Sequence, residues 1–77
     1  MNVDVASATR MVKAAASADP RTGLDAIVAL RDLLELSERL QVDAARAAGW
    51  SWRDIADRLG VSKQAVHHKH AHRPRGR

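Results

Sequence analysis

The 77-residue sequence contains no cysteine, no tyrosine and no phenylalanine, and it has only two prolines. The absence of cysteine excludes disulfides and thiolate chemistry. There is also no long apolar run and no positively charged leader with a cleavage site, so we expect a protein that stays in the cytoplasm and does not enter a membrane. A chain of this length buries only a modest core unless its helices pack closely or a second subunit helps.

Motifs for catalysis are missing as well. There is no glycine-rich phosphate loop, no nucleophile beside a base and no metal triad. A small helical chain also leaves little room for a substrate pocket. We therefore expect no enzyme activity, no cofactor and no small-molecule substrate.

Acidic residues are absent from residues 61–77. Residues 1–60 hold eight Lys or Arg and all nine Asp and Glu, a formal charge of −1, whereas residues 61–77 hold five Lys or Arg, a charge of +5, and all four histidines. A basic segment of this kind neutralises phosphates and releases counterions from duplex DNA. A solvated basic tail has the same composition. This segment, however, overlaps and follows the helical motif of residues 51–70, and that position favours an interpretation as a DNA-binding segment.

Residues 51–59 have the pattern of a short amphipathic helix. One apolar stripe, with the i, i+3, i+4, i+7 spacing of a helix, is formed by Trp52, Ile55, Ala56 and Leu59. Ser51 precedes the stripe as an N-cap, and Asp54 three residues later completes a capping box. We expect Trp52 to pack in the core.

A glycine and a second capping residue follow this helix. Gly60 ends it, because glycine readily adopts the left-handed conformation that a sharp turn needs. Ser62 is placed to cap a second helix, which begins at Lys63 and ends near Ala71 because Pro74 prevents its continuation. Two helices joined by so short a turn cross closely, which requires small side chains at the crossing.

The run GWSWRDIADRLGVSKQAVHHKH resembles the helix-turn-helix of small stand-alone DNA-binding proteins of the actinobacterial type, and the resemblance covers about residues 39–70. In that family the second helix enters the major groove. The resemblance implies that DNA is contacted by Ser62, Lys63, Gln64, His67 and His68. One departure is Lys69, where many such motifs have a large apolar residue. With the other basic and histidine side chains, the expected DNA-binding residues are Ser62, Lys63, Gln64, His67, His68, Lys69, His70, Arg73, Arg75 and Arg77.

Residues 73–77, Arg-Pro-Arg-Gly-Arg, resemble the core of an AT-hook. In that family an extended Arg-Gly-Arg segment lies along the minor groove of AT-rich DNA. The alternative interpretation is a disordered basic arm that binds phosphates. Both interpretations give Arg73, Arg75 and Arg77 a role in DNA binding.

Four histidines, His67, His68, His70 and His72, lie close together in the sequence. His68 and His72 are one helical turn apart, which raises the question of a metal site. A structural zinc site takes four ligands, and residues 61–77 offer no cysteine or carboxylate to complete one, so we expect no metal. We expect the histidines to donate to phosphates and bases, which predicts tighter DNA binding as the pH falls from about 8 to about 6.

Residues 24–48 contain no glycine or proline and predict one long helix that Gly49 ends. Its start is open, because Asp19-Pro20 and Thr22 with Asp25 both have the pattern of a helix start. The seam expected to pack against the motif helices consists of Leu30, Leu33, Ser37, Leu40, Ala44, Ala47 and Ala48, widened by Ile27 and Leu34. Another side of the helix carries Leu24, Val28 and Val42, so a further element has to cover the remaining apolar surface.

An alanine-rich helix is predicted over residues 4–18, with an apolar face and no breaker before Pro20. This helix either packs on the long helix as an antiparallel hairpin or supplies a dimer interface. Because helix-turn-helix proteins often bind two-fold sites, we favour a homodimer. The predicted fold class is all-α, with about four helices in one domain over residues 1–70 and a basic tail over residues 71–77.

These features predict binding to double-stranded DNA at the nucleoid. The protein is either a transcriptional regulator that reads sequence through Lys63 and Gln64, or a nucleoid-associated protein that relies on phosphates and groove shape. The absence of an effector-binding domain favours the second role or a regulator that acts without a ligand. The competing interpretation is a protein-interaction module that docks on the transcription machinery, although such a module has no evident need for an acid-free basic segment.

Overall fold

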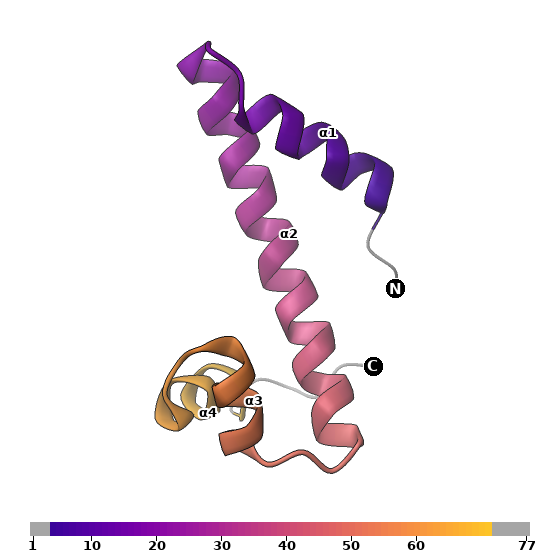
Figure 1. Ribbon diagram of the computed structural model, residues 1–77, viewed down its shortest axis with the longest axis vertical. Helices are drawn as coiled ribbons and strands as arrows, with labels where there is room; N and C mark the ends of the chain where they lie inside the picture. Colours follow the sequence, from indigo (N-terminus) through magenta and orange to yellow (C-terminus); the bar gives the residue numbers. More distant parts are fainter. Residues whose placement is uncertain (1–3, 72–77) are drawn as a thin grey trace. The chain divides into compact units, whose positions relative to one another are not determined.

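A computed structural model describes residues 4–71, and every regular element in this range is an α-helix (Figure 1). The helices are α1 (Val5–Ala15), α2 (Pro20–Ala47), α3 (Trp52–Leu59) and α4 (Lys63–Ala71). The predicted all-α fold is confirmed. The chain divides into two compact units, Met1–Ser37 and Glu38–Arg77, which we call unit 1 and unit 2. No helix of the described range is long and apolar enough to cross a membrane.

Aspartate side chains cap both helices of unit 1. The backbone N–H of Ala6 donates to Asp4 Oδ1 over 3.0 Å at the start of α1. At the start of α2, the backbone N–H groups of Arg21 and Thr22 donate to Asp19 Oδ1 and Oδ2 over 3.3 and 3.4 Å. Pro20 occupies the first helical position, where its missing N–H removes no helical hydrogen bond. The Asp19-Pro20 signal is therefore the one that starts the long helix, ahead of residue 24.

Within unit 1, α1 approaches α2 only near the turn that joins them and does not pack along it as the antiparallel hairpin considered from the sequence. At their contact Gly23 is buried, and a Cβ built on it would lie 3.6 Å from the carbonyl oxygens of Ala15 and Ser17. Ala26 of α2 is also buried. Two small residues thus let the ends of the two helices approach closely at the turn, but α1 itself contains no buried residue.

In unit 2 the turn between α2 and α3 forms as its residues predict. α2 ends at Ala47, and Gly49 has a φ of +90°, in the left-handed region that favours glycine. Ser51 then caps α3, because its Oγ accepts a hydrogen bond from the N–H of Asp54 over 3.1 Å. The predicted cap at Ser51 is confirmed.

The turn between α3 and α4 also follows the prediction. Gly60 is the C-cap of α3 with a φ of 71°, and the N–H of Val61 donates to the carbonyl oxygen of Ala56 over 3.1 Å. Ser62 Oγ accepts from the N–H of Ala65 over 3.0 Å and caps α4. α4 extends from Lys63 to Ala71, the last residue that the structure describes.

The core of unit 2 is small and draws on three helices. It consists of Val42 of α2, Ile55 and Ala56 of α3, and Val66 of α4. Ala45 and Trp52 pack against this cluster and remain partly exposed. The core therefore holds α3 and α4 on the last turns of α2, and Trp52 lies at its edge.

The side of α2 that contacts the motif helices differs from the predicted seam. Val42, which was assigned to another side, is the buried α2 residue of this core, whereas Ala44, Ala47 and Ala48 are exposed. Val42 enters the core, whereas Ala44 and Ala48 only line an open hollow beside Ile55 and Leu59 of α3. Valine buries more apolar surface than alanine, which favours the Val42 side. The predicted seam is wrong for this end of the helix.

Candidate nucleic-acid interface

α4 exposes most of the side chains that the sequence assigned to DNA contact. The exposed ones among the described residues are Ser62, Lys63, Gln64, His67, His68 and Lys69. Lys63, Gln64 and His67 come together on one side, where they line a shallow hollow with Trp52 of α3. α4 contains no acidic residue. This side of α4 therefore combines one full positive charge with amide and imidazole groups that can hydrogen-bond to DNA.

Trp52 connects this side of α4 to the last turns of α2. The His67 ring meets the Trp52 ring edge-on, with 5.3 Å between the ring centroids and 88° between the planes. The guanidinium carbon of Arg46 lies 4.5 Å from the centroid of the Trp52 ring, within the range of a cation–π interaction. Arg46 Nη1 also donates to the carbonyl oxygen of Trp50 over 2.7 Å. These contacts fix the orientation of the indole and place His67 against it.

His70 does not lie with the other expected DNA-binding residues. It is 7% exposed, and its Nε2 lies 2.7 Å from Oε2 of Glu38. Residues four apart share a helix face, so His70 follows Val66 toward the inside of unit 2. The expectation that His70 faces DNA disagrees with this burial. The side chain instead joins the last turn of α4 to α2.

Glu38 also pairs with Lys69, whose Nζ lies 3.1 Å from the same carboxylate oxygen. The hydrogen bond from His70 lowers the pKa of the Glu38 carboxyl below its usual value of 4.5, and the contact with Lys69 lowers it further, while partial burial acts in the opposite direction. Glu38 is therefore anionic at neutral pH. Because its charge offsets that of Lys69, the positive potential of α4 is strongest near Lys63.

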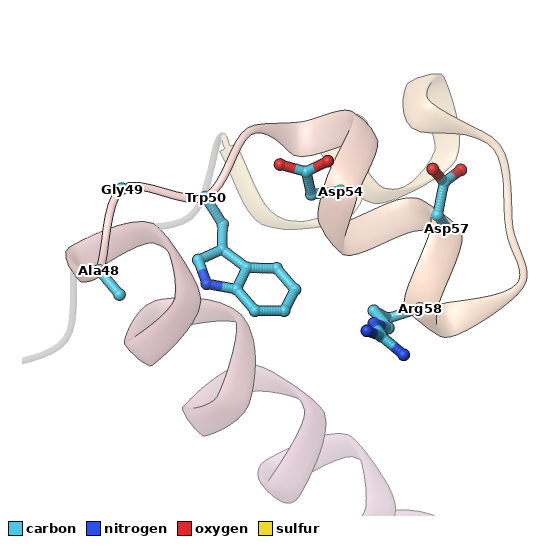
Figure 2. A pocket seen from close by; sticks show the side chains of 6 residues that line it. All are labelled: Ala48, Gly49, Trp50, Asp54, Asp57 and Arg58. Atoms are coloured by element: carbon cyan, nitrogen blue, oxygen red, sulfur yellow. The ribbon is translucent and has the colours of Figure 1, made fainter.

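A second hollow in unit 2 has different chemistry. Its lining residues, shown in Figure 2, are Ala48, Gly49, Trp50, Asp54, Asp57 and Arg58. The carboxylates of Asp54 and Asp57 lie on α3, and the Trp50 indole lies beside the last turns of α2 (Figure 2). Two carboxylates beside one guanidinium disfavour a phosphate. The side with Lys63 and His67 is the better candidate for contact with a polyanion.

The remaining expected site residues, Arg73, Arg75 and Arg77, lie outside the described residues, as does His72. The AT-hook-like segment therefore stays a prediction from the sequence. Within residues 4–71, no three His, Cys, Asp or Glu side chains gather in a group that could hold a metal ion.

Sequence patterns did not indicate Arg46 or Glu38 as neighbours of the candidate interface. Glu38 is 32 residues from His70 in the chain. Arg46 contacts Trp52 only because the turn at Gly49 brings the start of α3 back toward α2. The spacing of apolar residues along a single helix carries no information on such pairs.

Two short helices joined by a glycine turn, the second of which exposes basic and polar side chains, define the helix-turn-helix class of DNA-binding domains. A family model described as a homeodomain-like domain matches residues 33–76, which is more than half of the chain. The chain belongs to this family. No curated protein and no solved structure matches it significantly.

Proposed function

We propose that the protein binds double-stranded DNA by placing α4 in the major groove. The observation that carries this proposal is the exposed, acid-free side of α4 formed by Lys63, Gln64 and His67. Gln64 has the donor and acceptor needed to pair with adenine, and Lys63 suits guanine or a phosphate. His67 adds a hydrogen-bonding ring beside them.

Residues around this side supply contacts to the DNA backbone. Ser62, His68 and Lys69 are exposed and flank it, and contacts of this kind fix the register of a protein on the duplex. His67 and His68 are both exposed, and their rings can donate hydrogen bonds to the DNA. On sequence grounds, the basic residues Arg73, Arg75 and Arg77 extend the contact, in the minor groove as in an AT-hook or along the phosphates.

We infer that the protein acts at the bacterial nucleoid, as a nucleoid-associated protein or as a transcriptional regulator that needs no ligand. Residues 4–71 form only α1, α2 and the two helices of the helix-turn-helix, without a separate fold for an effector. Replacing Gln64 by Ala separates the two roles. A changed sequence preference indicates direct readout and a regulator, whereas an unchanged affinity and preference indicate binding through phosphates and shape.

We also infer that two copies associate through unit 1. The large exposed apolar side chains of this unit are Val5, Val12, Leu24, Ile27, Val28 and Leu34. Val5 and Val12 on α1 are seven residues apart, as are Ile27 and Leu34 on α2, and this is the repeat of a helix–helix seam.

Charge supports a second copy as the occupant of this surface. α1 holds two basic and no acidic residues, whereas the part of α2 in unit 1 holds two basic and three acidic residues. A two-fold pairing that sets α1 of each copy against α2 of the other therefore places opposite net charges together. Such a dimer presents two copies of α4, as a two-fold DNA site requires.

The test is selection from a random pool of duplexes at near-physiological salt, followed by sequencing of the bound DNA. An enriched motif supports a sequence-reading regulator, and two half-sites one helical turn apart support the dimer. Recovery without a motif supports a nucleoid-associated protein. No recovery contradicts DNA binding and favours a module that docks on the transcription machinery.

Deletion of residues 73–77 sharpens this test. We expect weaker DNA binding and a smaller dependence of affinity on salt concentration, because fewer phosphates are neutralised. The slope of log affinity against log salt should fall by up to about three for the three arginines removed. An unchanged slope would show that the tail does not contribute, even if the helix-turn-helix binds.

A further inference from the structure

The hollow on the exposed side of α4 has an aromatic wall. Trp52 and His67 form this wall at right angles to each other, and Lys63 and Gln64 complete the lining. Trp52 packs on the core of unit 2, and the Arg46 guanidinium lies against its ring. The wall is thus held in place by contacts that do not involve DNA.

The chemistry of this hollow fits an apolar group better than a phosphate. Trp52 and His67 present carbon-rich ring surface, and Lys63 is the only charged side chain in the lining. A phosphate placed against the indole would lose water contacts without gaining hydrogen bonds from the ring carbons. The apolar group that projects from base pairs into the major groove is the 5-methyl group of thymine.

We propose that the Trp52–His67 wall receives the 5-methyl group of a thymine while Gln64 hydrogen-bonds to adenine. Both contacts identify A·T pairs, so the hollow and Gln64 act together as one specificity determinant. The inference rests on the proposed binding of α4 in the major groove. It assigns Trp52, a residue of α3 outside the recognition helix, a direct role in reading bases.

The experiment compares two duplexes of the same AT-rich sequence, one with thymine and one with deoxyuridine, which lacks only the methyl group. We expect the full-length protein to bind the deoxyuridine duplex about fourfold more weakly for each contacted thymine, from the burial of one methyl group. Equal affinity for the two duplexes would overturn the inference and leave DNA binding intact. No binding to either duplex would overturn the proposed function, and this inference with it.

Two variants locate the effect. His67→Ala removes an exposed part of the wall, and Trp52→Leu keeps an apolar side chain against the core but removes the ring. In both variants the thymine-to-deoxyuridine affinity ratio should fall to about one. Circular dichroism verifies that the helices are retained, and His67→Ala carries the test if Trp52→Leu unfolds.

The matched control is His68→Ala, the same substitution at the next position of α4, which does not line the hollow. It should lower the affinity for both duplexes by the same factor and leave the ratio unchanged, because a phosphate contact does not sense the methyl group. A ratio that persists in His67→Ala and Trp52→Leu, or that collapses equally in His68→Ala, would show that the methyl group is read elsewhere.

Discussion

Units 1 and 2 differ in how far they bury their own apolar side chains. Each helical segment of unit 2 contributes to one core through Val42, Ile55, Ala56 or Val66. In unit 1, α1 has no buried residue and the side chain of Leu34 is 67% exposed. Since stabilisation scales with the apolar area removed from water, the helix-turn-helix is held by its own packing, whereas unit 1 gains most from an additional surface.

The two tryptophans make this comparison measurable. Trp50 and Trp52 both lie in unit 2, and unit 1 contains no aromatic residue. Intrinsic fluorescence therefore reports unfolding of unit 2, while circular dichroism reports the helices of both units. The following predictions use that difference.

The largest expected effect comes from the core of unit 2. Ile55 is 4% exposed, and Ile55→Ala should lower the free energy of unfolding by about 2–4 kcal/mol, because it leaves a cavity that so small a core cannot fill. Urea unfolding followed by fluorescence measures this change. The matched control is Ile27→Ala in unit 1, 41% exposed, which should change the same transition by less than about 1 kcal/mol. Equal losses would contradict the separation into two units.

Association through unit 1 gives the next effect. Replacing Val12 and Leu34 together by Ser should convert a dimer to a monomer, because the two substitutions remove apolar surface from the proposed interface on α1 and on α2. Sedimentation at micromolar concentration measures the mass. The control replaces Leu59 and Val61, exposed apolar residues of unit 2, by Ser and should leave the mass unchanged. A monomeric wild-type protein would rule out the dimer.

The Glu38 carboxylate makes unit 2 sensitive to acid. The hydrogen bond from His70 lowers the pKa of Glu38 in the folded chain, so the unfolded chain takes up this proton at a higher pH. The stabilisation that ionised Glu38 contributes is fully present when the pH is above 4.5, the usual pKa of the carboxyl. It is lost as the pH falls through the lower pKa of Glu38 in the folded chain.

Glu38→Gln should remove this dependence and, at neutral pH, lower the stability of unit 2 by about 1 kcal/mol, since the charged hydrogen bond is partly screened. Urea midpoints from fluorescence, measured between about pH 6 and about pH 3, test both effects. Glu35→Gln, the same substitution in unit 1, is the control and should leave the fluorescence transition and its pH dependence unchanged. A wild-type midpoint that is flat with pH would contradict the role of Glu38.

Loss of a helix cap gives a change no larger than that of Glu38→Gln. Ser51→Ala removes the acceptor for the Asp54 N–H and should lower the stability of unit 2 by about 1 kcal/mol, visible in the fluorescence transition. Asp4→Ala removes the cap of α1 and should reduce helix content by circular dichroism without moving that transition. A shift of the fluorescence midpoint in Asp4→Ala would show that the two units unfold together.

The features predicted correctly from the sequence are local ones. Ser51, Gly60 and Ser62 act on backbone groups within a few residues, so their positions in the chain are enough to predict the caps and turns of the motif.

The features that could not be predicted depend on pairs distant in sequence. Val42 rather than Ala44 enters the core, and this depends on how α3 and α4 pack on a part of α2 where both residues are apolar. His70 was expected at the DNA surface because histidine is polar and lies on the second helix of the motif. Its burial depends on Glu38, which lies 32 residues away and supplies a charged partner. The wall of Trp52 and His67 likewise joins two helices.

Ala56 is 1% exposed and contributes to the core that includes Val66 of α4. Single-base changes in an alanine codon yield valine, threonine, proline, serine, aspartate, glutamate or glycine. All of these except glycine enlarge the side chain where no space is left, several bury a polar group, and glycine weakens the helix. Codon 56 is therefore a position where nearly every missense mutation disrupts the fold. A genetic screen for loss of DNA binding should recover changes at this codon alongside those in the codons of the exposed side of α4.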